Sequence, residues 1–202
     1  MKTVCILLIS FLFFGCTGIE RLNNKIYEIQ KQSILESPYK SAIGTTVYVE
    51  AQKDFRLNKL PKLLRNKIYS GNALKDTIFM TESFDAICMN CPSDWMKVLL
   101  RDTVYSIRKM ILGHRGDIAY DIETEPFYAN SKDFQYELRN SDLIEIVGKI
   151  RNNQPWKTDP LQYGSDNCND GDYTVITVIY PDEKIEAMYV RCWMPSLYRN
   201  RK

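Results

Sequence analysis

The chain has 202 residues, and its 27 Lys and Arg side chains nearly balance its 25 Asp and Glu side chains. A protein that binds nucleic acid would carry a strongly positive domain or a basic stripe, so we expect no nucleic-acid partner. Aromatic residues make up 12% of the chain and only nine residues are Gly. This composition predicts a packed, strand-rich globular protein and excludes an acidic disordered tail.

The first sixteen residues have the pattern of an export signal. Lys2 supplies a positive charge, Val4 to Phe14 form an apolar stretch, and Gly15 precedes Cys16. An apolar helix of this length rises about 16 Å, well short of the roughly 30 Å of a bilayer core. We therefore predict a targeting segment rather than a membrane span.

The end of this segment, Leu12-Phe-Phe-Gly-Cys16, resembles the lipobox of bacterial lipoproteins, with Phe13 where Leu is preferred. The resemblance implies a signal peptide at residues 1–15 and attachment of a diacylglyceryl group, with its palmitate-type acyl chains, to the Cys16 thiol. It also implies a location in the bacterial cell envelope, with the lipid inserted in the inner or outer membrane. An ordinary cleaved secretory signal and a retained anchor are the alternatives.

Residues 16–44 are predicted to form a tether or an amphipathic helix before a single domain at 45–202. Between Ile19 and Leu35 the apolar residues recur three or four positions apart, and Pro38 follows. Such a helix either lies on the membrane surface or packs on the domain core. We favour the core, because amphipathic stripes usually face one.

The next segment is predicted to form a strand at Thr45–Ala51 and then a basic helix within Lys53–Tyr69. This helix would contact anionic lipid headgroups or, as we favour, present a solvated face opposite a leucine stripe. Its cations are Lys53, Arg56, Lys59, Lys62, Arg65 and Lys67.

From Thr77 onward, short runs of β-branched and aromatic residues alternate with turn signals, which predicts an antiparallel meander. Asn140 or Ser141 would begin a helix that ends at Arg151. The predicted strands are Ile78–Met80, Phe84–Cys88, Trp95–Arg101, Val104–Ile111, Ile118–Glu123 and Phe134–Leu138, and a final hairpin combines Tyr173–Tyr180 with Ile185–Cys192. The predicted fold class is therefore α+β: an antiparallel sheet, meander plus C-terminal hairpin, packed with one or two helices.

Four cysteines remain after cleavage of the predicted signal peptide, which contains Cys5, and lipidation of Cys16. An even number in an oxidising compartment predicts two disulfides. The candidates are Cys88, Cys91, Cys168 and Cys192. We favour local pairs, one across the Met89-Asn90 turn and one beside the final hairpin, where a turn at Asp182-Glu183 places residue 192 opposite residue 173. The other connectivities stay open.

The Cys88–Cys91 spacing also occurs in thioredoxin-like enzymes, where a strand-to-helix junction stabilises a thiolate. A thioredoxin core ends with a hairpin followed by a helix, whereas here the helix is predicted before the hairpin. A zinc site is disfavoured as well, because Cys168 and Cys192 are 24 positions apart. We expect no metal and no cofactor.

Other polar motifs are weaker candidates for chemistry. Asp166–Asp172 resembles part of a calcium loop but lacks its final glutamate, so a polar turn is favoured. Asp121, Glu123 and Glu125 would share one face of a strand, which we interpret as solvated. His114 is the only histidine, so a metal site built from several histidines is excluded, and no complete catalytic set is found.

The Cys88-Met-Asn-Cys91-Pro92 motif and the elements after it resemble a domain of unknown function that recurs in Gram-negative lipoproteins. The resemblance covers about residues 77–192 and implies a fold but no chemistry. We therefore expect a lipid-anchored envelope protein, more a noncatalytic binding or structural module than an enzyme, with another envelope protein as its expected partner. The alternatives are a thiol-disulfide oxidoreductase that uses the two cysteines and an envelope immunity or inhibitor protein.

Overall fold

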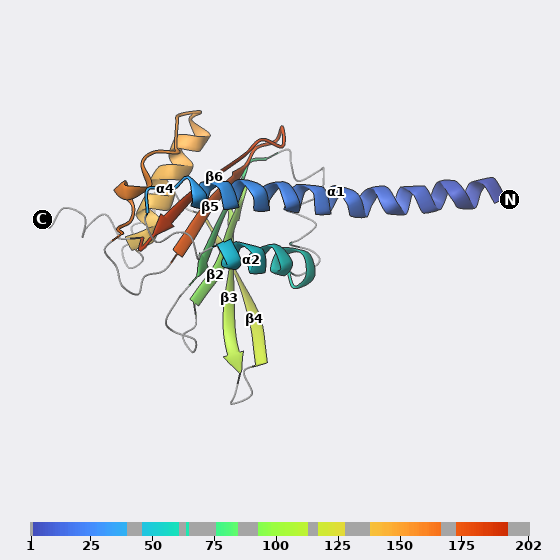
Figure 1. Cartoon of the computed structure of the whole chain (residues 1–202), viewed down its shortest axis with the longest axis horizontal. Coiled ribbons are helices and arrows are strands. Elements are labelled where there is room, and N and C mark those ends of the chain that lie inside the picture. Colours follow the sequence, from blue (N-terminus) through green and yellow to red (C-terminus); the bar gives the residue numbers. More distant parts are fainter. Residues whose placement is uncertain are drawn as a thin grey trace, which may run out of the picture.

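The computed structural model describes residues 2–39, 46–60, 64, 76–84, 93–112, 117–127, 138–166 and 173–193. These residues form an α+β fold, as predicted (Figure 1). The helices are α1 (Lys2–Leu35), α2 (Thr46–Asn58) and α4 (Leu138–Arg151), with a short 3-10 turn, η4 (Pro160–Gln162). The strands are β1 (Ile78–Phe84), β2 (Ser93–Leu100), β3 (Thr103–Leu112), β4 (Asp117–Pro126), β5 (Tyr173–Ile179) and β6 (Ile185–Arg191).

The strands form one six-stranded sheet in the order β4-β3-β2-β1-β5-β6, and every neighbouring pair is antiparallel. The predicted meander is therefore present as β1 to β4, and the C-terminal hairpin adds to its first strand. Ile78, at the start of β1, pairs with both Leu100 and Ile179. The β2–β3 turn and the β5–β6 turn consequently lie at the same end of the sheet.

Side chains along each strand alternate between the two sides of the sheet, so both sides carry apolar residues. Helices cover these residues on both faces. We call the side covered by α1 and α2 the α1 face, and the other side the α4 face. Figure 1 shows α1 crossing the sheet with α2 beside it, and α4 near the C-terminal end of α1. The α1 face buries Ile78 and Met80 of β1, whereas Phe79 between them packs into a separate apolar cluster with α4.

The first helix is part of the domain core. Leu22 and Ile26 are buried in the cluster of the α1 face, and Ile34 is buried nearer the end of the helix. The favoured prediction, an amphipathic helix packed on the core, is confirmed for this part of α1. Among the residues that the structure describes, no helix is long and apolar enough to cross a membrane.

The strand predicted at Thr45–Ala51 is wrong, since residues 46–51 of this segment are the first half of α2. Val47 and Val49 alternate with polar neighbours, which resembles a strand over a few residues. Over the longer segment the buried side chains are Val49, Gln52, Phe55 and Arg56, a helical spacing. Packing on α1 therefore overrides the local preference of the two valines.

Several predicted boundaries differ from the structure. The strand predicted at Ile78–Met80 continues to Phe84, while 85–92 lie outside the described residues. The helix predicted to begin at Asn140 or Ser141 begins at Leu138, so the end of the strand predicted at Phe134–Leu138 is helical. Residues 134–137 are also outside the description.

The final hairpin is confirmed, but its register is shifted by one residue. Tyr173 pairs with Arg191, not with residue 192. The backbone N–H of Tyr180 donates to the carbonyl of Lys184 at 2.9 Å, and Glu183 has a φ of 60°. These features define a three-residue loop that ends in a left-handed residue, and the extra loop residue shifts the pairing.

Candidate binding groove and polar pocket

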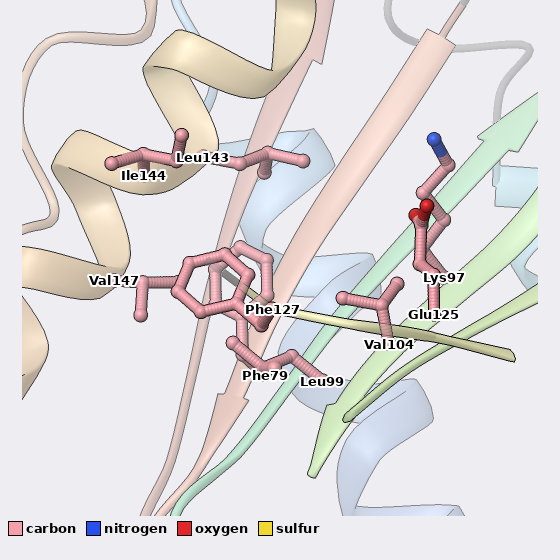
Figure 2. A pocket seen from close by; sticks show the side chains of 9 residues that line it. All are labelled: Phe79, Lys97, Leu99, Val104, Glu125, Phe127, Leu143, Ile144 and Val147. Atoms are coloured by element: carbon pink, nitrogen blue, oxygen red, sulfur yellow. The ribbon is translucent and has the colours of Figure 1, made fainter. Parts of the chain in front are cut away.

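An apolar groove lies on the α4 face, between α4 and the ends of four strands (Figure 2). Helix α4 turns one row of apolar side chains towards the sheet, so Ile146 and Val147 are buried while Leu143 is half-buried. The residues that line the groove are Phe79, Lys97, Leu99, Val104, Glu125, Phe127, Leu143, Ile144 and Val147. All but Lys97 and Glu125 are apolar.

The groove exists because α4 covers only part of its face of the sheet. Phe79 of β1 and Leu99 of β2 lie in the buried cluster under α4, whereas Val104 of β3 is only partly buried. Phe127 follows β4 and is held at the edge, because its backbone N–H donates to the carbonyl of Asp102 at 2.8 Å. Apolar side chains therefore line an opening at the surface, beside the part of the sheet that α4 covers.

The groove continues into a wider cavity of about 210 Å³ at the C-terminal end of α4. The two spaces share Phe79, Leu99 and Val147, and the wider one adds Arg101 and Arg151 as charged lining residues. The apolar part is narrow, about 30 Å³. Pockets for small molecules commonly measure about 300–1,000 Å³, so this space suits a protruding side chain better than a whole small molecule.

Paired charges surround the wider cavity. The Arg101 guanidinium contacts the Asp76 carboxylate at 2.7 Å, and the Arg151 guanidinium contacts the Asp102 carboxylate at 3.0 Å. Arg151 also donates to the backbone carbonyl of Arg101 at 2.9 Å. The rim is thus made of opposite charges in pairs, with no strong excess of either sign.

Arg101 has a backbone conformation that arginine seldom adopts. Its φ is 57°, in the two-residue turn between Leu100 and Thr103, where Gly or Asn is usual. Asp76 holds its side chain and Arg151 binds its carbonyl, and together these contacts offset the strain. Such strain often accompanies functional positions, which makes this turn part of the candidate site.

The strand surface beside the groove is polar and exposed. Asp121, Glu123 and Glu125 lie on the α4 face of β4, as the predicted alternation requires, and all three are exposed. Arg108 of β3 contacts Glu123 at 3.0 Å. The prediction of a solvated strand face is confirmed, and these carboxylates do not form an enclosed pair suited to glycoside hydrolysis.

A second, more polar pocket of about 470 Å³ lies where the loop after α4 meets the β5–β6 hairpin. Glu186 is its centre. One oxygen of this carboxylate accepts hydrogen bonds from the Trp156 indole at 2.7 Å and the Tyr180 hydroxyl at 2.8 Å, and the other contacts the Lys184 ammonium at 2.7 Å. The volume is in the range of small-molecule sites, but Glu186 already has three protein partners.

The acid–base groups of this pocket are poorly matched to proton transfer near neutral pH. Burial alone would raise the pKa of Glu186, but hydrogen bonds from Lys184, Tyr180 and Trp156 together lower it. Burial and the bond to Glu186 raise the pKa of Tyr180 to about 12. A general acid or base works best when its pKa lies near the working pH, so this network favours structure over catalysis.

A buried ion pair that the sequence pattern did not predict connects α2 to the sheet. Arg56 was expected on a solvated basic face, but its side chain is fully buried and contacts the Glu82 carboxylate at 2.5 Å. Gln30 of α1 donates to the other oxygen of Glu82, and Asn23 accepts from the Arg56 Nε at 2.7 Å. Glu82, an acid within the apolar run of β1, was the one signal that could have revealed this network.

Most cysteine predictions lie outside the described residues. Cys88, Cys91 and Cys168 are not described, and neither is the side chain of Cys16. Cys192 directly follows β6, is buried and takes part in a disulfide whose other sulfur is not described. The pairing of the cysteines therefore stays a prediction, as does lipidation.

The remaining motifs of the sequence offer no metal site in the described part of the chain. Asp166, the first residue of the calcium-like loop, accepts a hydrogen bond from Arg191 at 2.8 Å, while 167–172 and His114 are not described. Among described residues, no group of three His, Cys, Asp or Glu side chains could hold a metal ion.

Comparison with known proteins identifies no relatives: the chain matches no protein family, no curated protein and no solved structure. The resemblance to the CxxCP lipoprotein domain therefore stays a prediction.

Proposed function

We propose that this chain is a lipid-anchored protein of the bacterial cell envelope that has no catalytic activity and binds another protein. The observation that carries the proposal is the groove on the α4 face, where apolar side chains are surrounded by paired charges. The anchor part rests on the lipobox-like sequence that ends at Cys16.

The chemistry of the groove favours a polypeptide over a small ligand. Protein interfaces commonly combine an apolar centre with a polar rim in which Arg is frequent. Here Phe79, Leu99 and Val147 form the apolar centre, and Arg101 and Arg151 stand at the rim. The rim pairs would orient a partner that carries both signs of charge, while a branched or aromatic side chain of that partner enters the groove.

Two observations support a noncatalytic role. The groups of the polar pocket with clearly shifted pKa values are Glu186, Tyr180 and Lys184, and the last two are both bound to the Glu186 carboxylate. A redox CxxC motif usually accompanies a βαβ unit, whereas all strand pairs of the described sheet are antiparallel. An immunity or inhibitor protein remains a special case of protein binding, with a toxin as the partner.

Site-specific photo-crosslinking in intact cells tests the binding site. A photoreactive phenylalanine analogue would replace Ile144 or Val104 in the groove, with Asp121, in the middle of β4 and not among the residues that line the groove, as the matched control. We expect both groove positions to give the same adduct and the control to give none. The adduct partner, identified by mass spectrometry and purified, should bind the wild-type chain and lose affinity for the variant Ile144→Asp.

The proposal fails if the purified partner binds Ile144→Asp and the wild-type chain equally, or if only Asp121 gives an adduct. The anchor is tested separately by replacing Cys16 with Ala. This variant should lose incorporation of labelled fatty acid and leave the membrane fraction. Retention in the membrane without label would contradict lipidation.

A further inference from the structure

We infer that the surface around the start of the packed part of α1 lies against the lipid headgroups of the membrane. This anchor-proximal surface consists of Arg21, Lys25, Lys59, Glu183 and Lys184. The inference rests on the proposed lipidation of Cys16 and adds the orientation in which the anchored domain is held.

The proposed anchor is only a short distance along the chain from the core. Leu22, buried in the cluster of the α1 face, is only six positions after Cys16, and α1 is continuous between them. Six helical residues rise about 9 Å, and even a fully extended chain of that length spans only about 21 Å. A lipid on Cys16 therefore holds the start of the core close to the membrane.

Helix α1 is also attached to the sheet at this point. Arg21 contacts the Glu183 carboxylate at 3.6 Å, and the Lys25 ammonium donates to the Glu183 carbonyl. The β5–β6 turn is thus beside the first packed turn of α1, and Figure 1 shows the N-terminal half of α1 extending beyond it. The turn and the anchor cannot move far apart without breaking these contacts.

The end of α2 belongs to the same surface. The Asn23 side chain donates to the carbonyl of Lys53 at 3.2 Å, and Leu60 packs with Leu22 in one buried cluster. Lys59, between α2 and Leu60, is exposed. This residue brings a third lysine to the anchor-proximal surface, from a segment distant in sequence.

The charges of this surface suit phospholipid headgroups. Arg21 and Lys184 leave 76% and 60% of their side chains exposed, and Lys25 and Lys59 are also exposed. Long basic side chains keep their charge in the headgroup region while their stems cover apolar surface. Glu183 faces two of these cations, so contact with a membrane does not leave its charge unpaired.

Lysine acetylation of the vesicle-bound protein tests the orientation. The full-length lipidated chain would be bound to vesicles of phosphatidylethanolamine and phosphatidylglycerol, recovered by flotation, treated with a water-soluble acetylating reagent and analysed by mass spectrometry. The Cys16→Ala chain, taken from the supernatant, gives the reference rates. We expect Lys25, Lys59 and Lys184 to react several-fold more slowly on vesicles, and Lys97 and Lys149 of the α4 face to be unchanged.

The outcomes separate the orientation from the anchor. If the wild-type chain does not float with vesicles, or if Cys16→Ala floats equally, the anchor fails and the inference fails with it. If the chain floats through its lipid but all five lysines keep their reference rates, the anchor stands and the orientation is overturned. Slower reaction only at Lys97 and Lys149 would also overturn it, because the α4 face would then be the one covered.

Discussion

Removing one member of the buried pair between Arg56 and Glu82 should destabilise the protein severely. The two side chains leave 0% and 1% of their surface exposed, so neither can exchange its partner for water. In the variant Arg56→Met, Glu82 would keep only its hydrogen bond from Gln30. A buried charge that loses its partner costs about 3–5 kcal/mol, a large share of the roughly 5–15 kcal/mol that stabilise a typical domain.

The pair itself contributes much less than either single loss suggests. Arg56 and Glu82 paid a desolvation cost on burial, so replacing both with apolar residues removes the cost along with the attraction. The double variant Arg56→Met/Glu82→Leu should therefore be more stable than Arg56→Met alone. The difference between the double loss and the summed single losses measures the coupling.

Urea unfolding followed by circular dichroism measures these free energies. With a urea dependence of about 2 kcal/mol per M, Arg56→Met should lower the midpoint by about 2 M. The matched control is Arg108→Met, which breaks the exposed pair with Glu123 and should cost at most about 1 kcal/mol. A loss below about 1 kcal/mol for Arg56→Met, or a double variant that loses the sum of both single variants, would refute the reasoning.

Two further predictions concern backbone packing and pH. In thermal unfolding, Gly164→Ala should lower the midpoint strongly, because its new Cβ would be 2.0 Å from the backbone oxygen of Arg191. A Cβ added at residue 148 would have no atom within 4 Å, so Gly148→Ala should stabilise α4 by about 0.5–1 kcal/mol. Equal effects of the two glycine substitutions would contradict this packing. The lowered pKa of Glu186 contributes stability above its unfolded value, about 4.5, that is lost as the pH falls through the folded value. Chemical unfolding should be measured between about pH 3 and 7, the range in which carboxyls titrate. Glu186→Gln should lose less free energy of unfolding on acidification than the wild-type chain, and an equal loss would exclude this linkage.

The sequence patterns predicted the large elements well because their side chains carry clear periodicities. The apolar spacing of Leu143 to Ile150 predicted α4, and the two runs around Pro181 predicted the final hairpin. The stripe from Leu22 to Ile34 predicted a helix packed on the core. In each case one face of a regular element had to leave water, and this requirement is visible in the chain itself.

Local patterns were insufficient where distant contacts decide the outcome. Val47 and Val49 predicted a strand, but packing against α1 makes α2 a helix. Charged residues were assumed to be exposed, so the burial of Arg56 was not predicted. Its partner Glu82 is 26 positions away, and only the packing of α2 on β1 brings the two together.

The candidate groove could not be predicted from any single segment. Phe79, Leu99 and Val147 come from β1, β2 and α4, and each is an ordinary core residue in its own sequence context. Whether these buried residues line an open groove depends on how far α4 extends over the sheet. Such coverage is a property of packing between elements, not of periodicity within one element.

Local periodicity and short motifs were enough to predict the α+β class, the order of most elements and a lipid on Cys16. Packing between elements sets which apolar residues line the groove, which charges are buried and which surface surrounds the start of the packed part of α1. Those properties depend on contacts between residues far apart in the chain, such as Arg21 with Glu183 and Arg56 with Glu82. Desolvation, which sets the cost of each buried charge and the gain from each buried apolar side chain, takes effect only once these contacts have formed.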